Sequence, residues 1–171
     1  YVNKGETLCI TGNFQGGLNI KDGTVKICGT AQLSGLNLNG ASTIIINEGA
    51  SFSTNHLNIG NKCTFINYSQ SGVNISGGLN NNGKVENYGT INISGHVNNN
   101  GQGELTNACK MIIAGDFNQN KTMSLSGYFN INGSFHMNGG SSNEFAAGAL
   151  VECLKLVVNK NITGPNDGYA V

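Results

Sequence analysis

The stretch TINISGHVNNNG at residues 90–101 decides the fold, because VNISGGLNNNG at 73–83 and FNINGSFHMNGG at 129–140 repeat its pattern. Single apolar residues alternate with polar ones, and glycine and asparagine close each segment. Such alternation over three to six residues is typical of a strand with one buried face. The same short pattern occurs at residues 18–20, 36–38, 57–59, 73–75, 91–93 and 129–131.

The composition favours an ordered chain over a disordered one. The 171 residues suit one domain, and only 11% of them are charged, with a formal net charge of zero. Disordered chains usually combine low hydrophobicity with high net charge, which is absent here. The chain contains no Arg, so we do not expect it to bind nucleic acid. It also contains no apolar run of about 18 residues, so we do not expect it to insert into a membrane.

The spacing of the short strand segments predicts the architecture. They recur about every 18–21 residues and no segment has helical spacing, which indicates an all-β, single-stranded parallel β-helix (β-solenoid) of about eight turns. We expect a single domain over residues 1–171, with regular rungs over about 5–139 and an irregular C-terminal rung or cap over about 140–171. The rule for parallel crossovers favours right-handed winding. Asn-Gly pairs at 39–40, 82–83, 100–101, 132–133 and 138–139 are expected at corners with positive φ.

A second periodicity predicts a buried polar ladder. Asn47, Asn67, Asn87 and Asn107 recur at one constant interval, and each follows an apolar residue by two positions: Ile45, Phe65, Val85 and Leu105. Residues i and i+2 of a strand share a side, so the asparagines are expected to point inward with those apolar residues. Stacked amides can then satisfy one another by hydrogen bonding. Ile27 and Gly127 would bound the ladder.

The segments TLCITG, VKICGT, NISGGLNNNG and NACKMIIAGDFNQN give the chain a family resemblance. Over nearly its whole length it resembles the Asn/Gly-rich β-helical modules of large secreted and surface proteins of Bacteroidota. Such proteins are generally adhesin-like, and many are exported by the type IX route. The resemblance implies an extracellular, cell-surface location. Because the sequence opens at Tyr1 rather than Met, we expect a processed product or an excised fragment.

Parallel β-helices also include polysaccharide-degrading enzymes, but the residues here do not indicate catalysis. The acidic residues are scattered over the rungs: Glu6, Asp22, Glu48, Glu86, Glu104, Asp116, Glu144, Glu152 and Asp167. Glu86 and Glu104 are expected to face outward on adjacent rungs, with Lys84 beside Glu104 in a surface ion pair. We therefore predict no enzyme, no catalytic residue and no cofactor.

The cysteines and histidines do not predict a metal site. Cysteines at 9, 28, 63, 109 and 153 include no C-x-x-C pair. Cys9 and Cys28 should be diagonal neighbours, so a disulfide between them would need a register shift. We therefore favour the interpretation that the cysteines are small residues of the core or wall without disulfide bonds. Histidines at 56, 96 and 136 are evenly spaced, but their contexts differ, so they should not stack on a common face.

Two repeat positions could form surface arrays on the walls. Thr24 and Thr64 share a repeat position that Ile44, Lys84 and Glu104 are expected to fill in other rungs, and such charges would spoil an ice-binding face. Tyr68 and Tyr88 should stack outward. They form either an aromatic strip suited to sugar rings or a packing pair between rungs.

The ends of a solenoid are unpaired strand edges. The first rung, GETLCITG, shows no capping helix, and ALVECLKLVVNKNITG near the C-terminus is more apolar than any rung. We therefore predict an extracellular structural protein, an adhesin stalk module or a fibre subunit, whose end contacts include Ile10 and Leu156. Its partners would be copies of itself or adjoining repeats of a larger protein. The alternative is a glycan-binding surface module that uses the solenoid wall.

Overall fold

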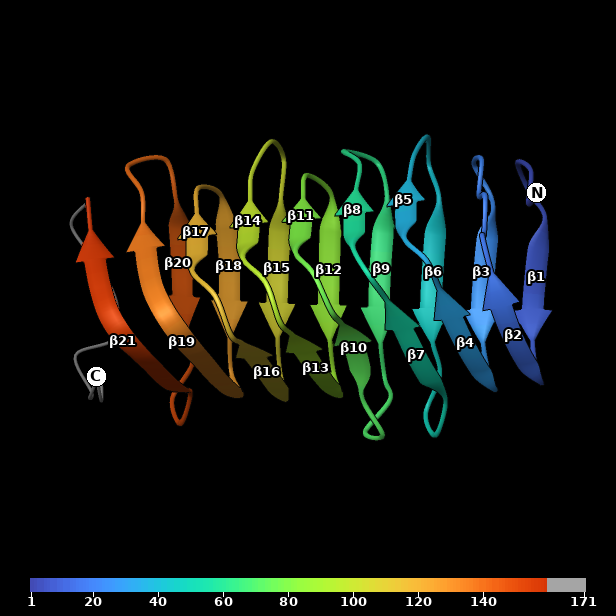
Figure 1. The fold of residues 1–171 in the computed structure, drawn as a ribbon. Helices are drawn as coiled ribbons and strands as arrows, with labels where there is room; N and C mark the ends of the chain where they lie inside the picture. The colour runs from blue at the N-terminus through green and yellow to red at the C-terminus, as the bar shows by residue number, and fades with distance from the viewer. Residues whose placement is uncertain (160–171) are drawn as a thin grey trace.

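The computed structural model describes residues 1–159, which form 21 strands and no helix. The chain winds in about eight turns, and all pairing between its named strands is parallel and joins successive turns (Figure 1). The predicted β-solenoid is therefore confirmed. No helix in the described part of the chain has the length and apolar character needed to cross a membrane.

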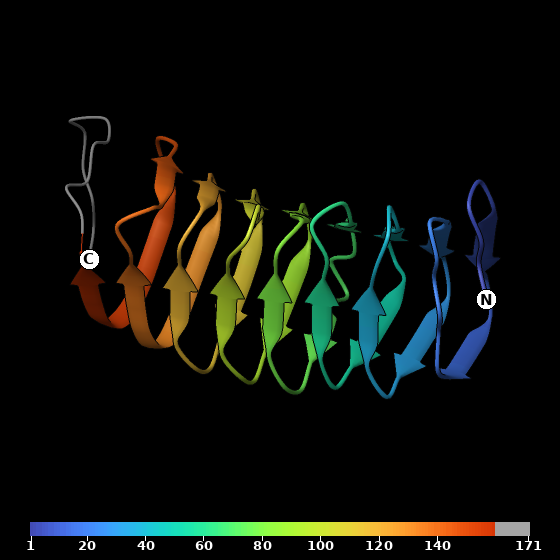
Figure 2. The same cartoon turned by 90° about the horizontal axis from the view of Figure 1, so that it is seen from above.

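Each complete turn contributes one strand to each of three walls. Wall A is the eight-stranded sheet, and walls B and C form one continuous sheet because the long strands near the C-terminus follow both (Figure 2). Wall A contains β1 (Thr7–Ile10), β3 (Thr24–Ile27), β6 (Thr43–Ile46), β9 (Thr64–Asn67), β12 (Lys84–Asn87), β15 (Glu104–Asn107), β18 (Thr122–Leu125) and β20 (Ser142–Phe145). Wall B contains β2 (Asn13–Gly16), β4 (Thr30–Leu33), β7 (Ser51–Thr54), β10 (Val73–Ile75), β13 (Thr90–Ile93) and β16 (Lys110–Ile113). Wall C contains β5 (Leu36–Leu38), β8 (Leu57–Ile59), β11 (Leu79–Asn81), β14 (Val97–Asn99) and β17 (Phe117–Gln119), while β19 (Tyr128–Met137) and β21 (Leu150–Val158) span both B and C.

The turns differ slightly in length, and this matters for the register. Thr7 pairs with Thr24 and Thr43 pairs with Thr64, so the later of these two turns is the longer. From Thr64 the next two steps, to Lys84 and then to Glu104, are equal to each other. Differences in length are taken up at the corners, so the strands themselves stay aligned.

The core is a stack of inward-facing side chains. Along β12, for example, Val85 is buried while its neighbours Lys84 and Glu86 are partly exposed. Because Val85 pairs with Phe65 and Leu105, inward residues form continuous columns along the rod. Burying one such side chain stabilises the fold by about 1.5–3 kcal/mol, and most of that burial depends on neighbouring turns. Phe117 packs between Phe129 and Phe135, with each pair of ring centroids 5.2 Å apart.

The Asn-Gly corners have two different physical causes. Gly40 and Gly101 adopt positive φ, 68° and 57°, as predicted. Gly83, by contrast, is needed for close packing, because a Cβ there would lie 2.2 Å from the carbonyl oxygen of Gly60. Gly83, Gly133 and Gly139 have no positive φ, so the prediction of positive φ was wrong for those three corners.

Candidate functional site: polar ladders, an aromatic pair and the two ends

Three of the four predicted asparagines form a buried ladder. Asn67 donates to Oδ1 of Asn87 at 2.9 Å, and Asn87 donates to Oδ1 of Asn107 at 2.7 Å. All three side chains are fully buried. Each amide also donates across the corner to a backbone carbonyl, that of Thr90, Lys110 or Tyr128. The ladder therefore fastens wall A to the start of wall B.

Asn47 is not part of this ladder, and its inclusion was wrong. Ile46 pairs with Asn67, so Ile46 occupies the inward position and Asn47 is half-buried, donating to Sγ of Cys28 at 3.0 Å. Ile45 consequently faces outward rather than inward. At the other end Leu125, not Gly127, pairs with Asn107. The cause is turn length, because the turns before Asn67 and after Asn107 differ in length from the two equal turns between them.

A second buried ladder was missed by the sequence reasoning. On the inner side of wall C and the start of wall A, Asn81 donates to Asn99, Asn99 to Gln119, and Gln119 to Asn143, at 2.8, 2.9 and 2.9 Å. The spacings of 18, 20 and 24 residues are unequal, which hides the periodicity. The available signal was parity, since Asn81, Asn99 and Gln119 each follow an inward apolar residue by two positions.

Asparagine also forms rows on the outer surface. On wall C, Asn58, Asn80, Asn98 and Asn118 each donate to the asparagine one turn earlier, beginning with Asn37, at 2.6–2.9 Å. These outer amides donate toward the N-terminal end, whereas the buried ladders donate toward the C-terminal end. Much of the polar surface of this wall is thus satisfied within the chain.

Tyr68 and Tyr88 stack against each other on the outside of wall A, as predicted. Their ring centroids are 5.3 Å apart with an interplanar angle of 11°, and the residues are 44% and 39% exposed. Each ring therefore covers one face of the other, which limits the area left for a sugar ring. Whether the pair contacts a ligand stays a prediction.

Threonines form a longer column on wall A than the sequence suggested. Thr7, Thr24, Thr43 and Thr64 pair in succession, and Thr43 rather than Ile44 occupies the position, because Ile44 is fully buried. Lys84 and Glu104 follow in the same column. The charged pair interrupts the column, as the sequence reasoning expected.

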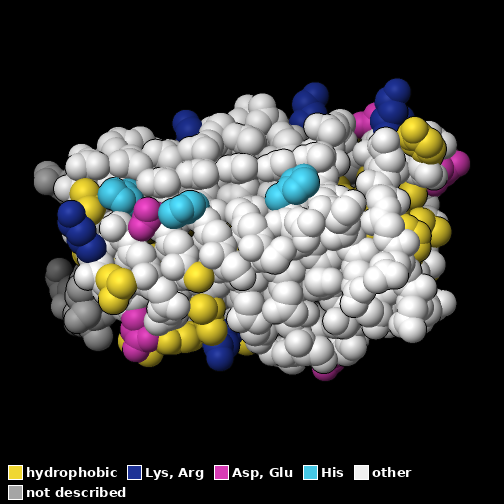
Figure 3. All heavy atoms as spheres, viewed as in Figure 1, with side chains coloured by type: hydrophobic (Ala, Val, Ile, Leu, Met, Phe, Trp, Pro, Cys, Tyr) yellow, Lys and Arg dark blue, Asp and Glu magenta, His cyan; other side chains and the backbone are white. Residues whose placement is uncertain are grey.

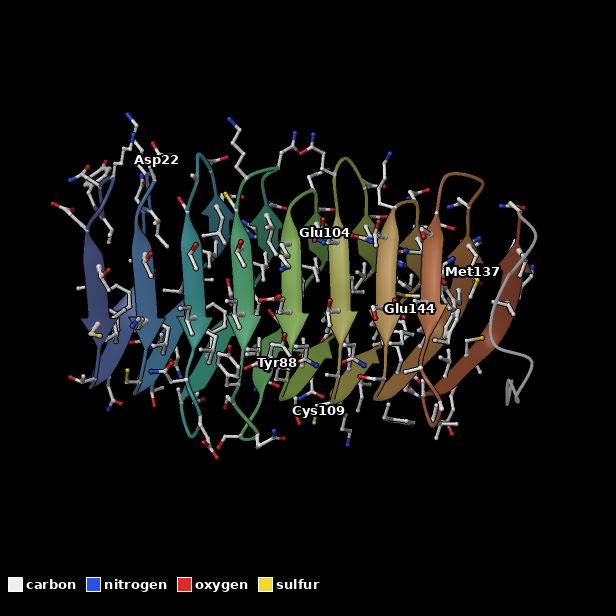
Figure 4. The ribbon with its side chains drawn as sticks, turned by 180° about the vertical axis from the view of Figure 1, so that it is seen from behind. Asp22, Tyr88, Glu104, Cys109, Met137 and Glu144 are labelled. Carbon is white, nitrogen blue, oxygen red and sulfur yellow. The ribbon has the colours of Figure 1, made fainter. Side chains whose placement is uncertain are left out.

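Within residues 1–159 the acidic side chains are spread along the rod rather than gathered in one cluster. Asp22, Glu104 and Glu144 lie on different turns (Figure 4). Lys84 forms its ion pair with Glu86 on its own strand, at 2.8 Å, rather than with the predicted Glu104, although Glu104 is its neighbour in the sheet. The hydrogen bond to Glu86 raises the pKa of Lys84. Within residues 1–159 no three His, Cys, Asp or Glu side chains could together hold a metal ion.

The cysteines are all free, and the histidines are separate. Cys9 and Cys28 are exposed, and Cys9 pairs in the sheet with Lys26 rather than with Cys28. The three histidines are visible as separate patches on one side of the rod (Figure 3), and each is two turns from the next along the chain. Nδ1 of His96 accepts a hydrogen bond from the backbone N–H of Asp116 at 2.9 Å.

Near the C-terminal end, a polar cluster joins the last two long strands. Glu152 on β21 accepts hydrogen bonds from the phenol of Tyr128 and, at 2.9 Å, from the amide of Asn130, both on β19. These bonds lower the pKa of Glu152, and the bond to the carboxylate raises the pKa of Tyr128. The cluster ties β21 to the preceding turn.

The predicted end contacts differ in exposure. Ile10 is 8% exposed, because it already packs into the first turn. Leu156 is half-buried on β21, where it pairs with Phe135. Leu8, 39% exposed and paired with Val25, is the more accessible residue of the first turn.

Comparisons with protein-family models, with curated proteins and with solved structures gave no significant match.

Proposed function

We propose that the chain is an extracellular structural rod, a stalk module or fibre subunit, whose copies stack end to end. The observation that carries this proposal is a contrast between the walls and the ends. Outer-wall polar groups are widely paired in ladders, whereas the first and last turns of the described residues leave apolar core positions partly exposed. On the face drawn in Figure 3, hydrophobic side chains gather toward the two ends, and the middle is almost free of them.

The two ends are compatible with each other. At the N-terminal end Leu8 is exposed and Phe14 and Leu18 are partly buried. At the C-terminal end Val151, Cys153 and Leu156 continue the core columns of Phe129, Ile131 and Phe135 and are partly buried. Both surfaces thus combine an apolar interior with the edge of a parallel sheet.

A copy stacked in register would continue walls A and B. Its β1 would pair with β20, which places Ile10 over Phe145, and its β2 would pair with β21, which places Phe14 over Val151. Within the described chain, β1 and β20 are the terminal strands of wall A, and an open strand edge recruits another strand. Such a head-to-tail contact does not close on itself, so it generates a filament. The neutral chain adds little electrostatic repulsion.

The resemblance to Asn/Gly-rich surface modules supports the extracellular assignment. It also suggests that adjoining repeats of a larger protein, instead of a second copy of this chain, could pack on these ends.

Electron microscopy and sedimentation of the purified protein test the proposal. We expect filaments with an axial repeat near the length of one rod, roughly 40 Å for eight turns. Leu8→Glu places a charge on the N-terminal side of the joint, and Leu156→Glu places one on the C-terminal side. Each substitution should shorten or abolish the filaments. Tyr88→Ser, a change on the outer wall, is the control and should leave them intact.

Circular dichroism must show the folded solenoid in each variant, because a charge placed beside the core would also disturb a terminal turn. A folded wild-type protein that stays monomeric at high concentration would overturn end-to-end stacking. Loss of assembly in Tyr88→Ser as strong as in the end variants would do the same.

A further inference from the structure

We propose that the middle of the rod carries a binding site for a neutral carbohydrate, in a shallow hollow on the outside of wall B. The hollow has a volume of about 170 Å³ and extends from the end of β4 over β7, β10 and β13. Two rows of side chains line it. One consists of Ser53, Asn74 and Asn92, which pair in register, and the other of Asn55, Ser76 and Ser94.

Part of each row is held in place by bonds within the chain. Asn92 donates to Oδ1 of Asn74 at 3.1 Å, and Ser76 donates to Oδ1 of Asn55 at 3.2 Å. These bonds fix the planes of both acceptor amides. The strands beneath are paired on both sides, so the hollow is preorganised, which lowers the entropic cost of binding.

The remaining polar atoms are available to a ligand. Within the described chain, Nδ2 of Asn74, Oδ1 of Asn92 and Oγ of Ser53 have no hydrogen-bond partner from the protein. An amide nitrogen donates, an amide oxygen accepts and a hydroxyl does both. Vicinal sugar hydroxyls need this mixture of donors and acceptors, because each hydroxyl can serve in both roles.

The other lining residues restrict the ligand class. Leu33, Thr54 and Ile75 complete the lining, but they are inward-facing residues only 5%, 3% and 1% exposed, so the polar rows provide most of the accessible surface, and no lining residue is charged. Phosphorylated or acidic ligands would find no cation there, whereas the uncharged hydroxyls of a sugar can bond to amide and hydroxyl groups alone. The volume is below the roughly 300–1,000 Å³ of sites that enclose drug-sized ligands. The hollow therefore suits one residue of a longer neutral chain lying on the wall.

This site does not depend on the proposed assembly. It lies over the second to fifth turns and includes no residue of the first or last turn, so carbohydrate binding and filament formation can fail independently.

Affinity electrophoresis of the whole protein tests the site. The gels contain dextran, a mannan, a mixed-linkage β-glucan or, as the charged comparison, polygalacturonate. We expect at least one neutral polysaccharide to retard the wild-type protein and polygalacturonate to have no effect. Asn74→Phe fills the hollow and should raise the apparent Kd about tenfold or more. Asn80→Phe makes the same change at an exposed asparagine of the same turn on wall C and should change the Kd by less than about twofold.

Three results would overturn the proposal, provided that circular dichroism shows the variants folded. One is no retardation by any of the neutral polysaccharides. A second is equal loss of retardation in Asn74→Phe and Asn80→Phe. The third is loss in Tyr88→Ser with normal retardation of Asn74→Phe, which would place the sugar at the tyrosine pair instead.

Discussion

The side chain of Asn87 is bonded on both sides by identical residues one turn away: it accepts from Asn67 at 2.9 Å and donates to Asn107 at 2.7 Å. It also accepts from the backbone N–H of Gly89 and donates to the carbonyl of Lys110. One side chain thus serves three consecutive turns and one corner.

Asn87→Leu should therefore destabilise the rod strongly. Several buried groups, including the N–H of Gly89, would lose a partner, and each unsatisfied group costs about 1–3 kcal/mol. Asn80→Leu removes a comparable pair of ladder bonds, to Asn58 and Asn98, from a residue that is exposed to water. Urea unfolding should show a clearly larger loss for Asn87→Leu than for Asn80→Leu. Equal losses would mean that burial of the ladder contributes nothing.

The register of the ladder can be tested at its N-terminal limit. Asn67→Leu should behave like Asn87→Leu, because Asn67 is fully buried. Asn47→Leu should lower the free energy of unfolding clearly less than Asn67→Leu does, since Asn47 is only half-buried and lies outside the ladder. Melting temperatures of the two variants decide the point. A melting temperature lowered as much by Asn47→Leu as by Asn67→Leu would show that Asn47 does belong to the ladder.

The cluster around Glu152 predicts a pH dependence with a defined sign. The pKa of Glu152 is lowered in the folded chain, so its contribution to stability is present above the unfolded pKa and is lost as the pH falls through the folded value. The pKa of Tyr128 is raised, so its contribution is lost as the pH rises through the folded value. NMR titration of Glu152 should give a higher pKa in Tyr128→Phe than in the wild type. An unchanged pKa would show that the phenol does not stabilise the carboxylate.

Thiol labelling should distinguish the cysteines by position. Cys9 and Cys28 are exposed and should react first, while buried Cys63 should react last. Burial raises the pKa of Cys153, so its labelling at neutral pH should be slow and should accelerate at higher pH. In filaments Cys153 should be further protected, because it faces the joint. Mass spectrometry of labelled monomers and filaments measures this, and equal labelling of Cys153 in both would argue against the proposed joint.

Several features of the fold could be predicted from particular residues. Alternation such as Ile91-Asn92-Ile93 predicts a strand locally, and its repetition predicts a solenoid, because neither inference needs knowledge of distant contacts. The register of the ladder could not be read in the same way. Asn47 continues the even spacing of Asn67 and Asn87 in the sequence, but the turn from β6 to β9 is longer than the turn from β9 to β12. The equal spacing in the sequence therefore predicted an inward position for Asn47, whereas Ile46 occupies that position in the structure.

The candidate sites depend on details that a sequence pattern does not contain. The stacking of Tyr68 on Tyr88 followed from one shared repeat position, and it was predicted. The hollow on wall B depends on how Asn74 and Asn92 orient their amides across two turns, and the exposure of Leu8 depends on which turn is the first. Both are properties of the assembled rod rather than of any one repeat.

The strands run across the rod rather than along it (Figure 1), and this has a mechanical consequence. A pulling force applied between the two ends loads the backbone hydrogen bonds of a single terminal turn, one after another, instead of shearing many at once. Detaching one turn of about 20 residues converts about 4.8 Å of rod into roughly 66–72 Å of extended chain. Under tension the molecule would lengthen stepwise and absorb work at each step, while the turns that remain wound keep their shape.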